Sequence, residues 1–90
     1  MSRQGGINMA RIIDGNDKNI VGENVRKFRT AKNMSQQMLS NKLEMMAIYI
    51  CRGSISRIEE KQRTVIDIEL YGIAKVLGVK ISDLFEDRSE

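Results

Sequence analysis

The chain has 90 residues and contains no proline, no histidine and no tryptophan; phenylalanine and tyrosine occur twice each. With so few aromatic residues, a core has to be built from Ile, Leu, Val and Met. Without proline, nothing in the chain forces a kink into its periodic apolar segments. Ninety residues suffice for one small domain with a single core. We therefore expect an all-α bundle of short helices.

The same absences limit the chemistry of the protein. The single cysteine, Cys51, excludes an internal disulfide and fits a reducing, cytoplasmic location. Without histidine, paired carboxylates or a metal-ligand motif, we expect no enzyme activity, no cofactor and no metal site. No apolar run is long enough to cross a bilayer, and no signal peptide is seen, so we expect no membrane partner.

The charge is unevenly distributed, although the net charge is only +3. Residues 1–34 carry seven Lys/Arg and three Asp/Glu, and residues 35–63 carry five and three. Residues 64–90 carry three and six. A basic first part followed by an acidic end suggests one face that meets an anion. A mixed soluble surface explains the charge alone equally well.

Apolar periodicity predicts helices over residues 20–32, 35–47, 52–60 and 67–77, followed by a short turn. Ser35 and Ser82 are expected to be N-caps, and Asn33 and Gly78 to end helices. Residues 1–18 predict a flexible N-terminal arm. The residues expected to face the core are Val21, Val25, Phe28, Leu39, Leu43, Met46, Ile55, Ile58, Leu70, Ile73, Ala74 and Leu77.

Methionines and a β-branched segment surround the end of the second predicted helix. Met38, Met45 and Met46 are expected to fill core gaps, which suits their flexible side chains. Residues 48–50, Ile-Tyr-Ile, are expected to cover the end of that helix; a dimer patch is the alternative.

Three segments in this order, SQQMLS, ISRIE and IAKVLGVKISDLF, resemble the Cro/C1-type (phage-repressor-like) helix-turn-helix family. The resemblance extends from Val21 to Phe85. It implies a compact five-helix lambda-repressor-like helix-turn-helix domain, which we place at residues 19–86, with a C-terminal tail at 87–90. Its third helix would lie in the major groove of DNA and its second would cross the backbone.

The function implied by this resemblance is a sequence-specific, double-stranded DNA-binding transcriptional regulator, expected to be a bacterial or phage repressor that binds as a homodimer, without a small-molecule substrate. Arg29 and Glu59 would form an ion pair between the first and third helices. The acidic end, with Val79, Ile81, Leu84 and Phe85, would face away from DNA and supply the dimer contact. The expected DNA contacts are Gln36, Gln37, Arg52, Gly53, Ser54, Ser56, Arg57, Lys61 and Arg63.

The third predicted helix begins with two weak helix formers, Gly53 and Ser54. Beside DNA, a glycine would let the backbone come close, and the serine could bond to phosphate or a base. Alternatively, Ser54 is an N-cap and Gly53 a turn residue. The family resemblance favours the first interpretation.

Two features depart from the family pattern. Eleven residues separate Leu43 from Ile55, which predicts a longer second helix or a longer turn. Lys61 stands where a glycine is usual, and because a left-handed lysine costs about 1 kcal/mol or more, we expect the linker to run differently there. Since a fold does not fix function, the alternative is a protein-interaction module or an antitoxin with the same fold.

Overall fold

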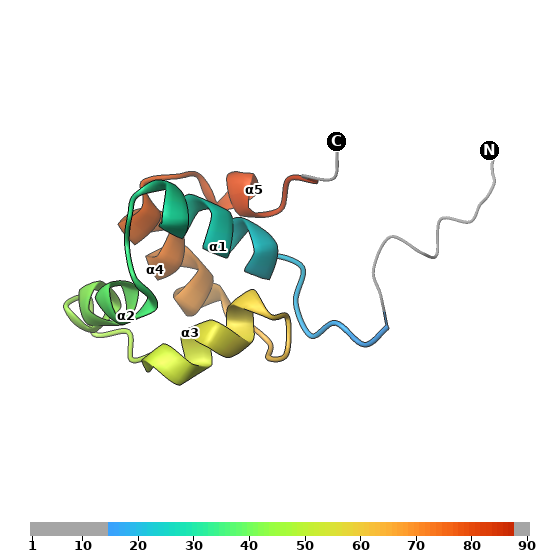
Figure 1. Ribbon diagram of the computed structural model, residues 1–90, viewed down its shortest axis with the longest axis horizontal. Coiled ribbons are helices and arrows are strands. Elements are labelled where there is room, and N and C mark those ends of the chain that lie inside the picture. The colour runs from blue at the N-terminus through green and yellow to red at the C-terminus, as the bar shows by residue number, and fades with distance from the viewer. Residues whose placement is uncertain (1–14, 88–90) are drawn as a thin grey trace.

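The computed structural model describes residues 15–87, and these form five helices and no strand (Figure 1). The helices are α1 (Gly22–Ala31), α2 (Gln36–Glu44), α3 (Arg52–Glu59), α4 (Asp67–Leu77) and α5 (Ile81–Leu84). The predicted all-α, five-helix architecture is confirmed. Helix α3 packs against α1 and α2, while α5 packs against α1 and α4.

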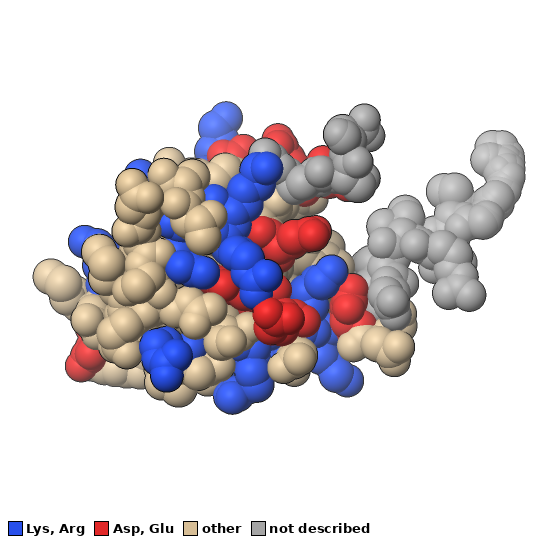
Figure 2. Space-filling model, in the orientation of Figure 1, with Lys and Arg blue, Asp and Glu red and all other residues tan. Residues whose placement is uncertain are grey.

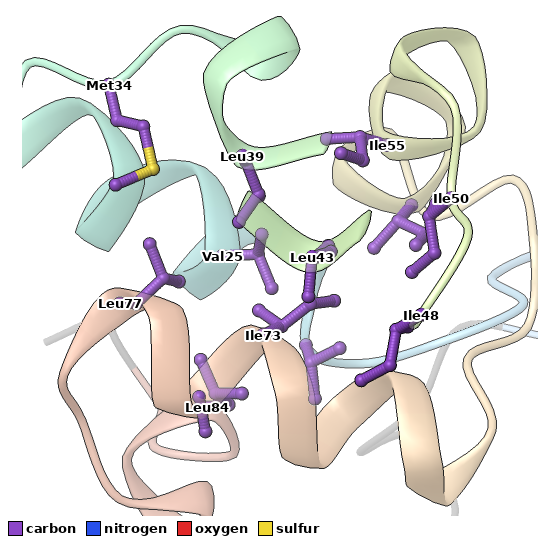
Figure 3. Packing of buried hydrophobic residues seen from close by; sticks show 13 residues of the cluster. Val25, Met34, Leu39, Leu43, Ile48, Ile50, Ile55, Ile73, Leu77 and Leu84 are labelled. Carbon is purple, nitrogen blue, oxygen red and sulfur yellow. The ribbon is translucent and has the colours of Figure 1, made fainter. Parts of the chain in front are cut away.

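The core is aliphatic, as the composition predicts, and its side chains converge from all five helices and from the connection after α2 (Figure 3). Met34 is the one methionine among residues 15–87 that is buried. The predicted inward residues are buried or half-buried, with the exception of Met46. The buried apolar residues are Val21, Val25, Met34, Leu39, Leu43, Ile48, Ile50, Ile55, Ile58, Ile73, Ala74, Leu77 and Leu84.

The expectation that three methionines near α2 fill the core is wrong. Met38, Met45 and Met46 are exposed, and Met45 keeps 86% of its accessible surface. Met38 lies within α2 on the side opposite the buried Leu39 and Leu43. For Met45 and Met46 the reason is that α2 ends at Glu44, so they leave the helical face that would have turned them inward. Ile48 and Ile50 of the following connection fill that space instead (Figure 3).

Asn19 fixes the start of α1 to the end of α3. Its Oδ1 accepts hydrogen bonds from the backbone N–H groups of Val21 (3.1 Å) and Gly22 (2.8 Å). Its Nδ2 donates to the carbonyls of Ile58 (3.0 Å) and Arg63 (2.8 Å). One side chain thus satisfies donors at the start of a helix and acceptors at the end of another.

The last residues of the predicted N-terminal arm also meet the end of α3. The N–H of Lys18 donates to the Lys61 carbonyl at 2.9 Å, and the Lys61 ammonium lies 3.6 Å from Asp17 Oδ2. Residues 1–14 of that predicted arm, and residues 88–90 of the predicted tail, lie outside the described residues.

Lys61 adopts the left-handed conformation, with φ at 62°. The expectation that the linker avoids this conformation is wrong. The Lys61 N–H donates to the Ile58 carbonyl at 3.0 Å and that of Gln62 to the Arg57 carbonyl at 2.8 Å, so this conformation closes the end of α3. Asn33 (φ 55°) and Gly78 (φ 71°) have the same conformation at the ends of α1 and α4, where the sequence predicts them.

Helix α5 begins two residues before the predicted position. The N-cap position is occupied by Lys80, not by Ser82, so that prediction is wrong. The Asp83 carboxylate accepts the Lys80 N–H at 3.0 Å and thereby takes over the stabilising contact at this terminus.

The C-terminal segment is fastened to α1 by a buried amide. Leu84 is fully buried, and Asn24 Nδ2 donates to the carbonyls of Leu84 (2.9 Å) and Glu86 (2.8 Å). Leu84 therefore belongs to the core of its own chain and is not available as a dimer contact. Ile81 and Phe85 remain exposed.

Helix α1 crosses α3 so closely that only glycine fits at residue 22. A Cβ atom there would overlap the carbonyl oxygen of Ile58 and press on the backbone of Glu59. Both are backbone groups at the end of α3, so neither can rotate away. Gly22 thus sets the distance between α1 and α3.

We expect Gly22→Ala to destabilise the protein by about 1–3 kcal/mol, because the added methyl group forces the two helices apart. The measurement is the free energy of unfolding in urea. The matched control is Gly53→Ala in α3, where an added Cβ meets no atom within 4 Å. That control is expected to gain about 0.5–1 kcal/mol from helix propensity. Equal stabilities of the two variants would contradict the close approach.

Candidate nucleic-acid interface

Helix α3 forms one edge of the bundle and has two different faces (Figure 1). Ile55, Ile58 and Glu59 are buried against the other helices. Gly53 and Arg57, four residues apart and thus on one side of the helix, are exposed. Figure 2 shows basic side chains along the edge of the molecule that α3 forms in Figure 1.

The first turn of α3 contains Ser54, and its hydroxyl is not the cap of the helix. Cys51 holds the N-cap position of the helix. Ser54 Oγ instead accepts a hydrogen bond from Arg57 Nη2 at 3.1 Å. The alternative interpretation of Ser54 as an N-cap is therefore wrong, and its contact with Arg57 steadies an arginine on the open face.

Cys51 is exposed beside this turn, and its Sγ lies 3.5 Å from Ser54 Oγ. Hydrogen bonds from the Ser54 side chain and backbone lower the pKa of the Cys51 thiol below its ordinary value.

Neither backbone conformation nor packing within the described residues requires a glycine at position 53. It lies within α3, and among the described residues Gly78 is the glycine with a positive φ, so the alternative of Gly53 as a turn residue is wrong. A side chain at this position would point into open space. A residue that costs helix stability and relieves no crowding is explained most simply by something outside the chain that comes close to α3.

A buried carboxylate holds α3 in place behind this open face. The Glu59 side chain has no exposed surface, and Arg29 binds it twice, through Nε to Oε2 at 2.6 Å and through Nη2 to Oε1 at 3.0 Å. Arg29 Nη1 also donates to the Met34 carbonyl at 2.7 Å, just before α2. The pair expected from the sequence therefore joins α1 and α3 and reaches the start of α2.

Two further side chains donate hydrogen bonds to Glu59. Gln36 Nε2 donates to Glu59 Oε1 at 3.0 Å, and Arg26 Nε donates to the same oxygen at 3.3 Å. Burial alone would raise the pKa of Glu59, but the hydrogen bonds from Arg29 and Gln36 outweigh it and hold the pKa below its ordinary value. The carboxylate is thus charged at neutral pH and fixes all three helices that surround it.

The remaining candidate residues fall into two groups. Arg52 and Gln37 are exposed, and the Gln37 amide donates to Asn41 at 2.9 Å. Ser56 is half-buried beside the open face of α3. Arg63 is bound twice by Glu69, at 3.0 and 2.9 Å, and so fastens the linker after α3 to the start of α4.

The longer segment between α2 and α3 is a longer turn and not a longer helix. It comprises Met45–Cys51, because α2 ends at Glu44 and α3 begins at Arg52. Ala47 adopts a left-handed conformation (φ 63°), and Ser40 Oγ donates to the Ile50 carbonyl at 2.6 Å. The extra residues thus leave both helices regular.

Sequence analysis missed several residues that position α3, namely Asn19, Arg26 and Ser40. A signal was present for Asn19, since asparagine directly before a predicted helix is a favoured N-cap. No sequence signal pointed to Gln36 or Arg26 as partners of Glu59, because that contact exists only when three helices meet.

Residues 15–87 contain neither a candidate metal site nor a membrane-spanning helix. No cluster of Cys, Asp or Glu side chains in that part of the chain could hold a metal ion. No helix there is long and apolar enough to cross a membrane.

The fold is similar to that of a controller protein whose structure has been solved. The chain is similar to the restriction-modification controller protein C.AhdI from Aeromonas hydrophila, with a TM-score of 0.64 and 28% sequence identity. The match covers 72% of this chain and 87% of that one. No family model matches the sequence, and no curated protein matches it. The helix-turn-helix fold expected from the sequence is confirmed, and the similarity supports a DNA-binding regulator at the level of the fold.

We expect Glu59→Gln to lower stability by about 3 kcal/mol at neutral pH, because it leaves Arg29 buried without its counter-charge. The folded-state pKa of Glu59 is lowered, so its contribution is complete above the ordinary glutamate pKa of about 4.3 and is lost as the pH falls through the folded-state value. The gap between wild type and variant should therefore close in acid. Urea unfolding across a pH series measures it.

The control for this experiment is Glu60→Gln, the neighbouring carboxylate. Glu60 is exposed and bonds to Arg26 Nη2 at 2.5 Å. An exposed pair contributes about 0–1 kcal/mol, so this variant should remain close to wild type at every pH. A gap for Glu59→Gln that stays constant in acid would show that its carboxylate is not the charged centre of the cluster.

Proposed function

We propose that this protein is a sequence-specific, double-stranded DNA-binding transcriptional regulator that places α3 in the major groove. The observation that carries the proposal is the open face of α3. It presents two arginines and a glycine, and no packing within the chain explains the glycine. Residues 45–58, which include the turn and most of α3, contain no acidic residue that would repel phosphate.

In this proposal the first turns of α3 read the bases. The planar guanidinium groups of Arg52 and Arg57 suit bidentate binding of guanine O6 and N7. Ser54 and Ser56, both half-buried, are proposed to donate to phosphate or base edges. The hydrogen bond from Arg57 to Ser54 holds that arginine in one orientation and lowers the entropy lost on binding.

The backbone contacts are assigned to residues on either side of α3. Gln37 at the start of α2 and Lys61 after α3 are proposed to bind phosphate, which positions the protein without reading sequence. Gln36 is held by Glu59 and is proposed to reach phosphate from that fixed position. Arg63 is bound to Glu69, so its proposed role is to support the linker beside Lys61 rather than to bind DNA directly.

We propose that the active form is a homodimer that represses by covering its site. Helix α5 lies on the opposite side of the bundle from α3 (Figure 1), and Ile81 in this helix and Phe85 directly after it are exposed. These two residues, with half-buried Val79, make up the proposed dimer contact. A two-fold dimer of this kind would read two half-sites about one helical turn apart.

The experiment that tests the function is selection of duplexes from a random DNA pool by the purified protein. We expect enrichment of a two-fold symmetric site with half-sites about 10 base pairs apart. Enrichment of a single half-site would support sequence-specific DNA binding and contradict the proposed dimer. No enrichment, with retention lost at moderate salt, would leave backbone attraction alone and favour a protein-interaction module or antitoxin of the same fold.

On the selected duplex, Arg52→Glu and Arg57→Glu are each expected to weaken specific binding by at least about tenfold, since each removes a base contact of about 1–3 kcal/mol. Fluorescence anisotropy at fixed salt measures this. Lys75→Glu is the matched control, because it changes the net charge equally on α4, where Lys75 stacks over Tyr71. If all three variants weaken binding equally, overall charge and not α3 is responsible.

Gly53→Ala should separate stability from binding. The added methyl group meets no atom of its own chain, so unfolding is expected to require slightly more urea than for wild type. The same methyl group would stand between the α3 backbone and DNA, so we expect specific affinity to fall by about tenfold or more. An unchanged affinity would show that α3 does not approach DNA through this turn.

A further inference from the structure

The turn Met45–Cys51 is firmly anchored, yet it exposes its largest side chain. Ile48 and Ile50 are buried on either side of Tyr49, and the Ile50 carbonyl accepts a hydrogen bond from Ser40. The Ile48 N–H donates to the Leu43 carbonyl at 3.0 Å. Between these two anchors, the Tyr49 side chain remains 75% exposed. Among residues 15–87, no hydrogen bond to its hydroxyl is found.

Tyr49 lies on the side of the turn that leads into the open face of α3. Side chains of an extended segment alternate between its two sides. Here Ile48 and Ile50 point inward, while Tyr49 and Cys51 are exposed. Cys51 is the N-cap of α3, so Tyr49 is two residues before the helix proposed to enter the groove. Along the chain, the exposed residues Tyr49 and Cys51 thus lead directly to Gly53 and Arg57 of α3.

We propose that Tyr49 binds the sugar-phosphate backbone of DNA at the margin of the site, outside the bases that α3 reads. This inference rests on the proposed DNA-binding function and extends it. The phenolic hydroxyl donates to a phosphate oxygen, and the ring packs on the adjacent sugar. Tyrosine is a regular donor to phosphate in protein–DNA interfaces. Because the turn is already fixed, little backbone freedom is lost when the contact forms.

Charge and position favour DNA over a second copy of the chain as the occupant of this turn. No acidic residue occurs from Met45 through Ile58, and Arg52 lies three residues after Tyr49. The self-contact proposed above lies at α5, on the opposite side of the bundle from α3 (Figure 1), so the turn before α3 is not part of it.

The test is a double-mutant cycle between the protein and the DNA backbone. Wild type and Tyr49→Phe are bound to the selected duplex, in which single phosphates around the site are replaced by uncharged methylphosphonates. We expect Tyr49→Phe to weaken binding about threefold to tenfold on the unmodified duplex, which is the range of one hydrogen bond. At one phosphate outside the base pairs that α3 contacts, the methylphosphonate should weaken DNA binding by the wild type by a similar factor. The same replacement should leave DNA binding by Tyr49→Phe unchanged.

Tyr71→Phe is the matched control, because Tyr71 is half-exposed on α4 and is expected to bind as wild type does. Tyr49→Phe with unchanged affinity, or without coupling to any phosphate, overturns the inference while leaving the proposed function intact. Sedimentation of Tyr49→Ala without DNA tests whether a second copy of the chain occupies the turn. If this variant loses the self-association of the wild type, the turn is a contact between copies and the inference is overturned. A wild-type chain that enriches no duplex overturns both proposals.

Discussion

The arrangement of the helices depends on one buried carboxylate. Glu59 stands at the end of α3, and its two oxygens receive hydrogen bonds from Arg29 and Arg26 of α1 and from Gln36 of α2. Leaving the buried Glu59 or the largely buried Arg29 unpaired would be costly, so this contact strongly favours one arrangement of the three helices. Because the carboxylate is at the back of α3, it fixes the orientation of the helix without occupying its outer face.

A second set of contacts secures the two ends of α3. At its C-terminal end, Asn19 binds the Ile58 and Arg63 carbonyls, and Gly22 lets α1 come close to the same backbone. At its N-terminal end, Ser40 and the buried Ile50 hold the incoming turn. Both ends are therefore held by polar contacts or close packing. The first turn of α3, with Arg52, Gly53 and Ser54, is left rigid and open.

The residues of α3 thus divide according to what they contact. The apolar pair Ile55 and Ile58, with Glu59, serves the fold, whereas Gly53 and Arg57 contribute little to it. Such a division is what a surface that binds a large external partner requires: a fixed helix whose outer side chains are free. The similarity to a controller protein supports a DNA-binding regulator at the level of the fold, and residues 45–58 contain no acidic residue.

The sequence by itself determined the all-α class, the boundaries of α4 and the inward faces of α1 and α3, because apolar periodicity and local capping signals are short-range. It also identified Arg29 and Glu59 as a pair through the family resemblance. It misplaced Met46 and the start of α5, since a helix that ends early, or a carboxylate that caps in place of a serine, depends on a balance of small local terms. Only the tertiary structure decided that Lys61 takes a left-handed conformation, that Gln36 and Arg26 join Glu59, and that Tyr49 is exposed between two buried isoleucines. The Glu59 cluster and the packing of Ile48 on α4 join segments distant in the chain, which no local pattern encodes. The Lys61 conformation is fixed by hydrogen bonds that close the end of α3 and by the contact of Lys61 with Lys18.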